Sequence, residues 1–348
     1  MGIIRFLLAL AVVGAHSNSH QLLKFVGGEV AVQAFYVISG FYMAMIVRTY
    51  STKKKFWISR YLRLYPAYIV CALLSLYLVQ GVRPYIDNIE KLPISAIVFL
   101  GLTNLTIFFQ DITMFLGVNG DSLSFVKFFG ESSPHLYQLL LIPQGWSLGV
   151  EISFYILAPF ILTRSIRTIS AFVFLSAILR IGLIGYCFSG DPWSYRFFPN
   201  EISTFLLGSL AYKFYEIKKT GGAIDDFSIL ALPTLLIFLI GFNFLPTEYQ
   251  TKKIIFILVL VFTIGNIFNV TKNSKMDNFM GMLSYPIYVS HLFVLGYLLP
   301  KLHLPSPDGR FINTLLAYVL VTVFSIALYF LIDKPADLFR HRFKSKVG

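Results

Sequence analysis

The chain has 348 residues, of which 56% are hydrophobic and only 13% charged, and its formal net charge is +12. Soluble domains carry roughly 25% charged residues, so the composition excludes a soluble globular protein and indicates a polytopic helical membrane protein. In such a protein the positive charge is expected to face anionic lipid at the cytoplasmic surface, and no nucleic-acid partner is expected.

Apolar segments follow one another along the chain and are candidates for membrane helices, although the first is too short to span a bilayer comfortably. The candidates are 3–16, 30–47, 63–80, 93–110, 144–163, 169–188, 201–215, 227–245, 254–270, 280–299 and 311–332. If every segment crossed, the basic loop with Arg164 and Arg167 would lie outside and the later basic loops would be inverted, against the positive-inside rule. The positions of the basic loops therefore favour about ten spans, with 93–110 not crossing and both termini in the cytoplasm.

Segment 93–110 then belongs to an external stretch, roughly 81–143, that we interpret as a re-entrant or interfacial lid. We expect an all-α protein with a single membrane domain over residues 1–348 and no appended soluble domain. Cys71 and Cys187 both fall in apolar runs, so neither a disulfide framework nor a thiolate metal site is expected.

The first apolar segment contains two ionisable residues, Arg5 and His16, eleven positions apart. On a helix this spacing places both side chains on one face, about 16 Å apart along the axis. By themselves they fit either a snorkelling arginine and an interfacial histidine or a functional pair. His20 adds an H-x3-H spacing, but without further ligands no metal site is expected.

Arg60 and Arg63 form an R-x-x-R pair at the cytoplasmic end of a predicted helix, next to Lys53, Lys54 and Lys55. The pair fits ordinary positive-inside anchoring equally well as a phosphate clamp, because guanidinium groups bind phosphate oxygens bidentately.

The stretch QGWSLGVE places Glu151 about two turns inside its helix, with Trp146 and Ser147 near the interface. A carboxylate within a membrane segment is a functional candidate, or it pairs with an arginine to hold helices together. Arg180, in the middle of another apolar segment, must face a cavity or a carboxylate, and either Glu151 or an anionic ligand would serve.

The stretch LSYPIYVSH contains Pro286 in mid-helix and His291 five residues later. Pro286 is expected to kink the helix. His291 fits a packing or pore-lining role better than a catalytic one.

Taken together, these motifs resemble the acyltransferase-3 family of membrane O-acyltransferases, which acylate surface polysaccharides and related glycans. The resemblance runs in order over essentially the whole chain, through R-x10-H at 5–16, VQAFYVISGF at 32–41, R-x-x-R at 60–63, WSLGVE at 146–151, SYPIYVSH at 284–291 and LIDKP at 331–335.

The resemblance implies ten membrane helices and transfer of an acyl group, usually acetyl, from cytoplasmic acyl-CoA to a sugar hydroxyl on the extracytoplasmic side. It implies that His16 is the catalytic histidine, that Arg5 supports it, and that Arg60 and Arg63 lie near the CoA entrance. Glu151 matches the glutamate of the family's WSLSVE-type motif.

The chain departs from the family pattern at two positions. Many members have Asp where this chain has Gln33, and Glu is commoner than Asp333 in the terminal motif. We expect no C-terminal SGNH-type domain of the kind that some members carry, and we therefore expect the chain to work alone or with a further partner.

Our hypothesis is that His16 acts as general base on the acceptor hydroxyl or takes the acyl group itself. Glu151 would orient the imidazole or stabilise its charged form. Arg180 would bind the donor and neutralise the oxyanion, or bind an acidic sugar. The remaining substrate-binding candidates are Gln33, Trp146, Ser147 and His291.

The expected co-substrate is acetyl-CoA, with no metal. The expected partners are a glycan acceptor, either free or lipid-linked, membrane lipids, and either glycan-assembly proteins or further copies of the chain. The expected location is the bacterial inner membrane. The rival interpretations are a transporter or flippase with an intramembrane proton relay, and a structural subunit of a glycan-assembly complex.

Overall fold

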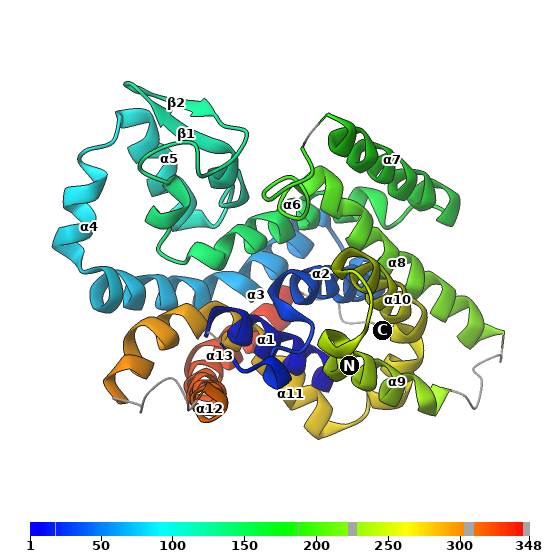
Figure 1. Cartoon of the computed structure of the whole chain (residues 1–348). Helices are drawn as coiled ribbons and strands as arrows, with labels where there is room; N and C mark the ends of the chain where they lie inside the picture. The colour runs from blue at the N-terminus through cyan, green and yellow to red at the C-terminus, as the bar shows by residue number, and fades with distance from the viewer. Residues whose placement is uncertain (18, 187, 222–227, 303–309, 344–348) are drawn as a thin grey trace. The chain divides into compact units, whose positions relative to one another are not determined.

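The computed structural model describes residues 1–17, 19–186, 188–221, 228–302 and 310–343, and most of them are helical (Figure 1). This confirms the expected all-α class. The described chain forms two compact units. The first unit comprises Met1–Arg48, Phe160–Val173 and Thr204–Phe330, and the second comprises Thr49–Pro159, Phe174–Ser203 and Leu331–Gly348. The single membrane domain expected over 1–348 stays a prediction.

Among the described residues, six helical segments are long and apolar enough to cross a membrane: Gln21–Thr49, Lys53–Gln80, Ile166–Gly185, Tyr249–Thr271, Lys275–Leu302 and Arg310–Phe343. Three shorter apolar helices accompany them, at Gly2–His16, Ile94–Thr106 and Ile229–Phe244. These segments support an integral membrane protein. About ten spans, and the sidedness of the termini, stay predictions.

The helices of the first unit are α1 (Gly2–His16), α2 (Gly27–Ile46), α9 (Ser228–Gly241), α10 (Tyr249–Thr271), α11 (Lys275–Phe293), α12 (Arg310–Leu328) and most of α8 (Phe198–Thr220). Helix α1 packs against α2, α11 and α12. Two close helix contacts rest on glycines. A Cβ at Gly2 would overlap the backbone of α11 near Gly281, and a Cβ at Gly208 of α8 would overlap the backbone of α2. Small residues let membrane helices approach this closely.

The N-terminus of α1 is capped by a residue from α11. The Asp277 carboxylate accepts hydrogen bonds from the backbone N–H groups of Gly2 at 2.7 Å and Ile3 at 2.9 Å. These N–H groups have no partner within their own helix, and the helix dipole favours a negative charge there. Asp277 therefore ties the first turn of α1 to α11.

The second unit contains α3 (Lys53–Leu74), α4 (Val82–Ile89), α5 (Ile94–Thr106), β1 (Leu116–Asn119), β2 (Ser122–Phe125), α13 (Lys334–Arg340), and most of α6 (Trp146–Ile161) and α7 (Ile166–Gly185). Helix α3 begins where the Thr52 hydroxyl accepts the Lys55 N–H at 3.3 Å, as an N-cap residue does. Helix α13 packs on α3.

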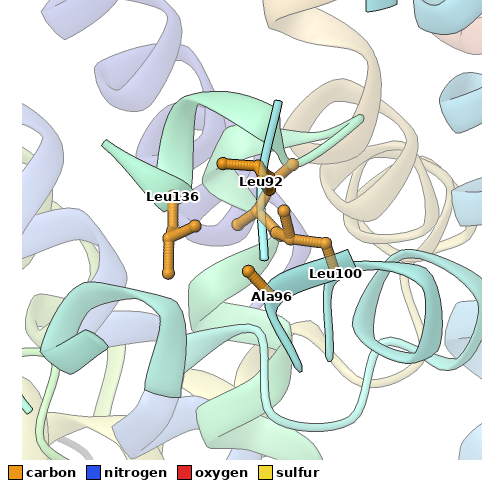
Figure 2. Close-up of a cluster of buried hydrophobic side chains, with 5 residues drawn as sticks. Leu92, Ala96, Leu100 and Leu136 are labelled. Atoms are coloured by element: carbon orange, nitrogen blue, oxygen red, sulfur yellow. The ribbon is translucent and has the colours of Figure 1, made fainter. Parts of the chain in front are cut away.

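The stretch interpreted as a lid, 81–143, has a small apolar core of its own. Figure 2 shows this cluster and labels Leu92, Ala96, Leu100 and Leu136; its fifth member is Leu140. Helix α5 has 13 residues, or about 20 Å, which is shorter than the ~30 Å hydrocarbon core. Its length is therefore compatible with a segment that does not cross.

The same stretch contains an antiparallel hairpin, β1–β2, that the sequence analysis did not predict. Asn119 pairs with Ser122 across the turn formed by Gly120 and Asp121. Gly120 has φ +55°, the left-handed conformation that such two-residue turns require. The Gly-Asp pair between two short alternating runs is a hairpin signal that was present in the sequence.

Candidate functional site

His16 is the last residue of α1, and its side chain is exposed. Its Nδ1 lies 2.9 Å from the carbonyl oxygen of Val12. A carbonyl oxygen can only accept a hydrogen bond, so Nδ1 carries the proton and the neutral ring presents the lone pair of Nε2. The local helix geometry thus selects the tautomer in which Nε2 is a base.

His291 of α11 lies beside His16 in the first unit. The ring centroids are 5.0 Å apart and the rings are tilted by 47°. The His291 side chain is fully buried, and its Nδ1 lies 2.6 Å from the Tyr288 carbonyl oxygen. Its Nε2 is buried without a hydrogen-bond partner among the residues that the structure describes. The two histidines belong to separate motifs of the sequence, and the fold makes them neighbours.

Arg5 lies at the opposite end of α1 from His16. Its guanidinium is 5.9 Å from the centre of the Tyr42 ring of α2, and a Cβ at Gly281 would lie 3.6 Å from its Nη1. Three helical turns separate the two side chains, and the support of Arg5 for His16 stays a prediction. Gln33 is buried in α2 of the same unit.

His20 has a local role in the described structure. Its Nδ1 accepts the Leu22 N–H at 3.3 Å, and its ring meets Phe311 edge-on at 5.6 Å. No group of three or more His, Cys, Asp or Glu side chains in the described ranges is arranged to hold a metal ion. Cys71 is a buried free thiol, and Cys187 lies outside the described residues.

Arg60 and Arg63 lie on α3 in the second unit. Arg63 Nη1 forms an ion pair with Asp333 Oδ2 at 3.2 Å. Asp333 of the terminal LIDKP motif therefore holds one arginine of the R-x-x-R pair. Arg60 is 7% exposed, and its Nη2 donates to the Tyr50 hydroxyl at 3.4 Å.

The WSLGVE motif forms the start of α6. Ser147 Oγ donates to the Gln144 carbonyl oxygen at 3.2 Å, and Glu151 Oε1 accepts the Tyr155 hydroxyl at 2.5 Å. Trp57 of α3 donates to the Tyr155 carbonyl oxygen at 3.1 Å, so α3 and α6 are joined within the second unit. His16 belongs to the first unit, and the predicted pairing of Glu151 with His16 stays a prediction.

Trp146 is covered by an arginine that the sequence analysis did not single out. The Arg196 guanidinium lies 4.3 Å from the centre of the Trp146 ring. The Asp191 carboxylate accepts two hydrogen bonds from it, at 2.6 and 2.9 Å. Stacking and bidentate pairing together fix the guanidinium plane. Trp146 is 6% exposed, so this cluster holds it within the protein.

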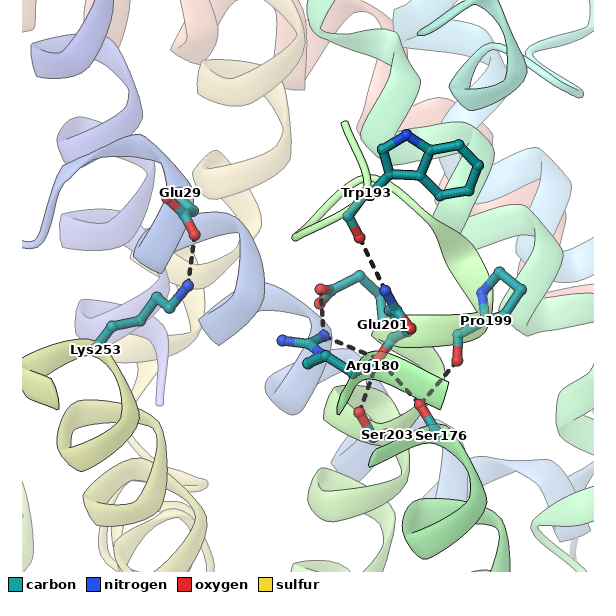
Figure 3. A network of polar contacts seen from close by, with 9 residues as sticks. Glu29, Ser176, Arg180, Trp193, Pro199, Glu201, Ser203 and Lys253 are labelled. Carbon is teal, nitrogen blue, oxygen red and sulfur yellow. Dashed lines mark hydrogen bonds and ion pairs between the residues drawn. The ribbon is translucent and has the colours of Figure 1, made fainter. Parts of the chain in front are cut away.

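Arg180 of α7 forms an ion pair with Glu201 of α8 (Figure 3), with Nη2 to Oε1 at 2.8 Å. The same Nη2 donates to the Asn200 carbonyl oxygen at 2.9 Å, and Ser176 donates to Pro199 and Asn200 carbonyls. Glu201 is fully buried. From the sequence, Arg180 was expected to face a cavity or a carboxylate, with Glu151 or an anionic ligand as its partner; in the structure the partner is Glu201. The role of Arg180 toward a donor or an oxyanion stays a prediction.

Asp111 is a buried carboxyl group that the sequence analysis missed. It follows a tight loop in which Ile107 and Phe109 take left-handed φ values of 68° and 64°. Its Oδ1 has no hydrogen-bond partner in the described chain and faces α6, because a Cβ at Gly149 would lie 2.6 Å from it. Burial raises the pKa of Asp111 to about 7, although its own N–H and that of Ile112 oppose the rise.

Comparison with known proteins places the chain among acyltransferases. A family model described as an acyltransferase domain matches residues 1–334. An uncharacterised protein of Aquifex aeolicus is 28% identical over 152 residues, covering 43% of this chain and 68% of its own. No solved structure matches significantly.

Two further relatives are longer than this chain. A Staphylococcus aureus protein, named provisionally as an O-acetyltransferase, is 27% identical over 330 residues, covering 84% of this chain and 50% of its own. The peptidoglycan O-acetyltransferase OatA of Listeria monocytogenes is 25% identical over 338 residues, covering 88% of this chain and 50% of its own. The chain thus spans about half the length of these two relatives.

Proposed function

Since the chain belongs to the acyltransferase-3 family, we propose that it transfers an acetyl group from acetyl-CoA to a hydroxyl of an extracytoplasmic glycan. The family match over residues 1–334 supports acyl transfer, and the names of two relatives support O-acetylation. The apolar helices support an enzyme that works within a membrane, which we propose is the bacterial cytoplasmic membrane, with both termini on the cytoplasmic side.

The observation that carries the proposal is the tautomer of the neutral His16 ring. The Val12 carbonyl fixes the proton on Nδ1, so Nε2 is available to take a proton from the acceptor hydroxyl. As that proton leaves, the hydroxyl oxygen bonds to the thioester carbonyl carbon, the carbon–sulfur bond breaks, and the CoA thiolate recovers the proton from the imidazolium. An imidazole suits both transfers because its ordinary pKa is near neutrality.

The same nitrogen is the one that would carry an acetyl group if the reaction proceeds in two steps. In that route Nε2 attacks the thioester carbon, the carbon–sulfur bond breaks and CoA leaves as the thiolate. The glycan hydroxyl oxygen then bonds to the acetyl carbon, the carbon–nitrogen bond to the imidazole breaks, and the hydroxyl proton passes to the CoA thiolate. Acid-quenched protein incubated with labelled acetyl-CoA and no acceptor distinguishes the two, since only the two-step route leaves label on His16.

The acceptor proposed is a surface glycan such as an O-antigen, a capsule, an exopolysaccharide or peptidoglycan. The peptidoglycan activity in the name of the Listeria relative supports the last of these. The partners proposed for this reaction are glycan-assembly proteins or further copies of the chain.

Mass spectrometry of surface glycans from cells with and without the gene tests this function. The proposal predicts a mass difference of one acetyl group on a glycan hydroxyl, restored when the gene is returned. Glycans that are identical in both strains, together with no acetyl-CoA consumption by the purified protein, would contradict it.

A further inference from the structure

Three arginines gather where α13 packs on α3 in the second unit. Arg60 and Arg63 come from α3, and Arg340 is the last residue of α13. Arg60 is 7% exposed and Arg340 8% exposed, and the charges of both Arg60 and Arg63 act on Arg340. Burial of like charges together is unfavourable unless anions compensate them.

The carboxylates in this cluster compensate two of the three arginines. Arg63 pairs with Asp333 at 3.2 Å, and Arg340 pairs with Asp337 at 2.8 Å. Arg60 pairs with no carboxylate in the described part of the chain. It has the long hydrogen bond to Tyr50, at 3.4 Å, and a buried Nε without a partner among the described residues.

Among the described residues, the positive charge of Arg60 is therefore not balanced by a carboxylate, and its buried Nε–H has no acceptor. A phosphate group supplies what is missing, because its oxygens carry the charge and accept several guanidinium hydrogen bonds at once. The Tyr50 hydroxyl, which also shares a hydrogen bond with Ser59 at 2.8 Å, is a further donor next to Arg60.

We propose that Arg340, together with Arg60, binds a phosphate of the nucleotide part of acyl-CoA. The proposal rests on the proposed function and adds a residue from outside the R-x-x-R motif. Arg340 also lies beyond residues 1–334, which the family model matches. Helix α13 would thereby bring a second guanidinium to the donor, with Asp337 holding that guanidinium until the phosphate arrives.

The first test measures CoA binding by calorimetry, with the full chain in nanodiscs of zwitterionic lipid. Arg340→Gln is expected to weaken CoA binding about 10- to 100-fold, the usual value of a hydrogen bond to a charged group. The matched control is Arg342→Gln, since Arg342 is exposed and lies against the ring of Phe339. Equal CoA affinity in wild type and Arg340→Gln would overturn the inference.

Two further binding measurements test whether Arg340 only stabilises the fold. Asp337→Asn releases Arg340 and should leave CoA affinity equal or higher, whereas a purely structural ion pair would make Asp337→Asn as harmful as Arg340→Gln. Pantetheine, which lacks every phosphate of CoA, should bind wild type and Arg340→Gln equally. A loss of pantetheine affinity as large as that of CoA would contradict a phosphate contact.

A last arm separates CoA from a lipid headgroup with the same chemistry. If Arg340→Gln lowers affinity for phosphatidylglycerol nanodiscs but not for CoA, the nucleotide is the wrong source and the proposal fails. If the wild-type protein binds no CoA at all, the donor assigned under the proposed function fails first. These two failures are therefore distinguishable.

Discussion

His16 and His291 face each other with their ring centroids 5.0 Å apart, one at the end of α1 and the other within α11. Each ring has its Nδ1 against a main-chain carbonyl of its own helix. Both rings therefore carry the proton on Nδ1 when neutral, and both Nε2 atoms are left as bases. A proton taken up by His16 has a second imidazole beside it.

We predict that His291 takes part in catalysis as a positioning residue for His16. His291→Gln should lower kcat about 100-fold, in the range of acid–base contributions, with little change in KM for acetyl-CoA. It should also change the pH profile of kcat. His20→Gln is the control, because His20 contacts Phe311 and Leu22 instead. A wild-type kcat and pH profile in His291→Gln would show that the ring only fills space.

We predict that Asp277 keeps α1 in place. Asp277→Ala removes the acceptor of the Gly2 and Ile3 N–H groups and should cost about 1–2 kcal/mol of stability. It should also lower kcat, since α1 positions His16. Thermal unfolding in detergent measures the first effect.

The control for this prediction is Asp87→Ala, which breaks an exposed pair with Arg83 and should change stability by less than about 0.5 kcal/mol. Equal effects of the two substitutions would contradict the capping role.

We predict that Asp111 makes stability depend on pH. Burial raises its pKa from 3.8 to about 7, so between these values the native state keeps a proton that the unfolded chain has lost. The contribution of the protonated Asp111 to the free energy of unfolding is therefore fully present below about pH 4. It falls as the pH rises toward 7 and is lost above it. Asp111→Asn should flatten melting temperature against pH and exceed wild type at pH 8. The exposed Asp121→Asn should follow the wild-type curve. Parallel curves for Asp111→Asn and wild type would refute this.

We predict that α2 and α8 need a glycine where they cross. A methyl at Gly208 would overlap the Val37 carbonyl oxygen, so Gly208→Ala should cost about 1–3 kcal/mol through overpacking. Gly182→Ala on α7 meets no atom within 4 Å and should be neutral or stabilising by up to about 1 kcal/mol. Denaturation midpoints of the two variants compare them directly, and a neutral Gly208→Ala would contradict the close contact.

The sequence predicted the helical membrane class and the location of His16 at the end of a short helix, because composition and helical spacing are local properties. It did not predict that His291 would meet His16. That contact depends on how α1 crosses α11, which the glycine contact at Gly2 and the Asp277 cap determine. The hairpin around Gly120 had a local signal that was not used.

The partner of Arg180 shows the same limit. An arginine within an apolar segment needs a compensating group, and that need was readable from the sequence. Which carboxylate supplies it depends on the packing of α7 against the start of α8, where Glu201 is buried. Asp111 was missed because it begins a 3-10 helix of five residues, which is too short for a periodicity that predicts burial.

The central claim is that His16 Nε2 is the base that starts acetyl transfer. The most direct measurement is label transfer from acetyl-CoA to a glycan acceptor by the purified protein in liposomes, with wild type, His16→Ala and His20→Ala compared at equal folded fraction. The account predicts that His16→Ala loses transfer by about 100-fold or more while His20→Ala retains it. Full transfer by folded His16→Ala would contradict the account.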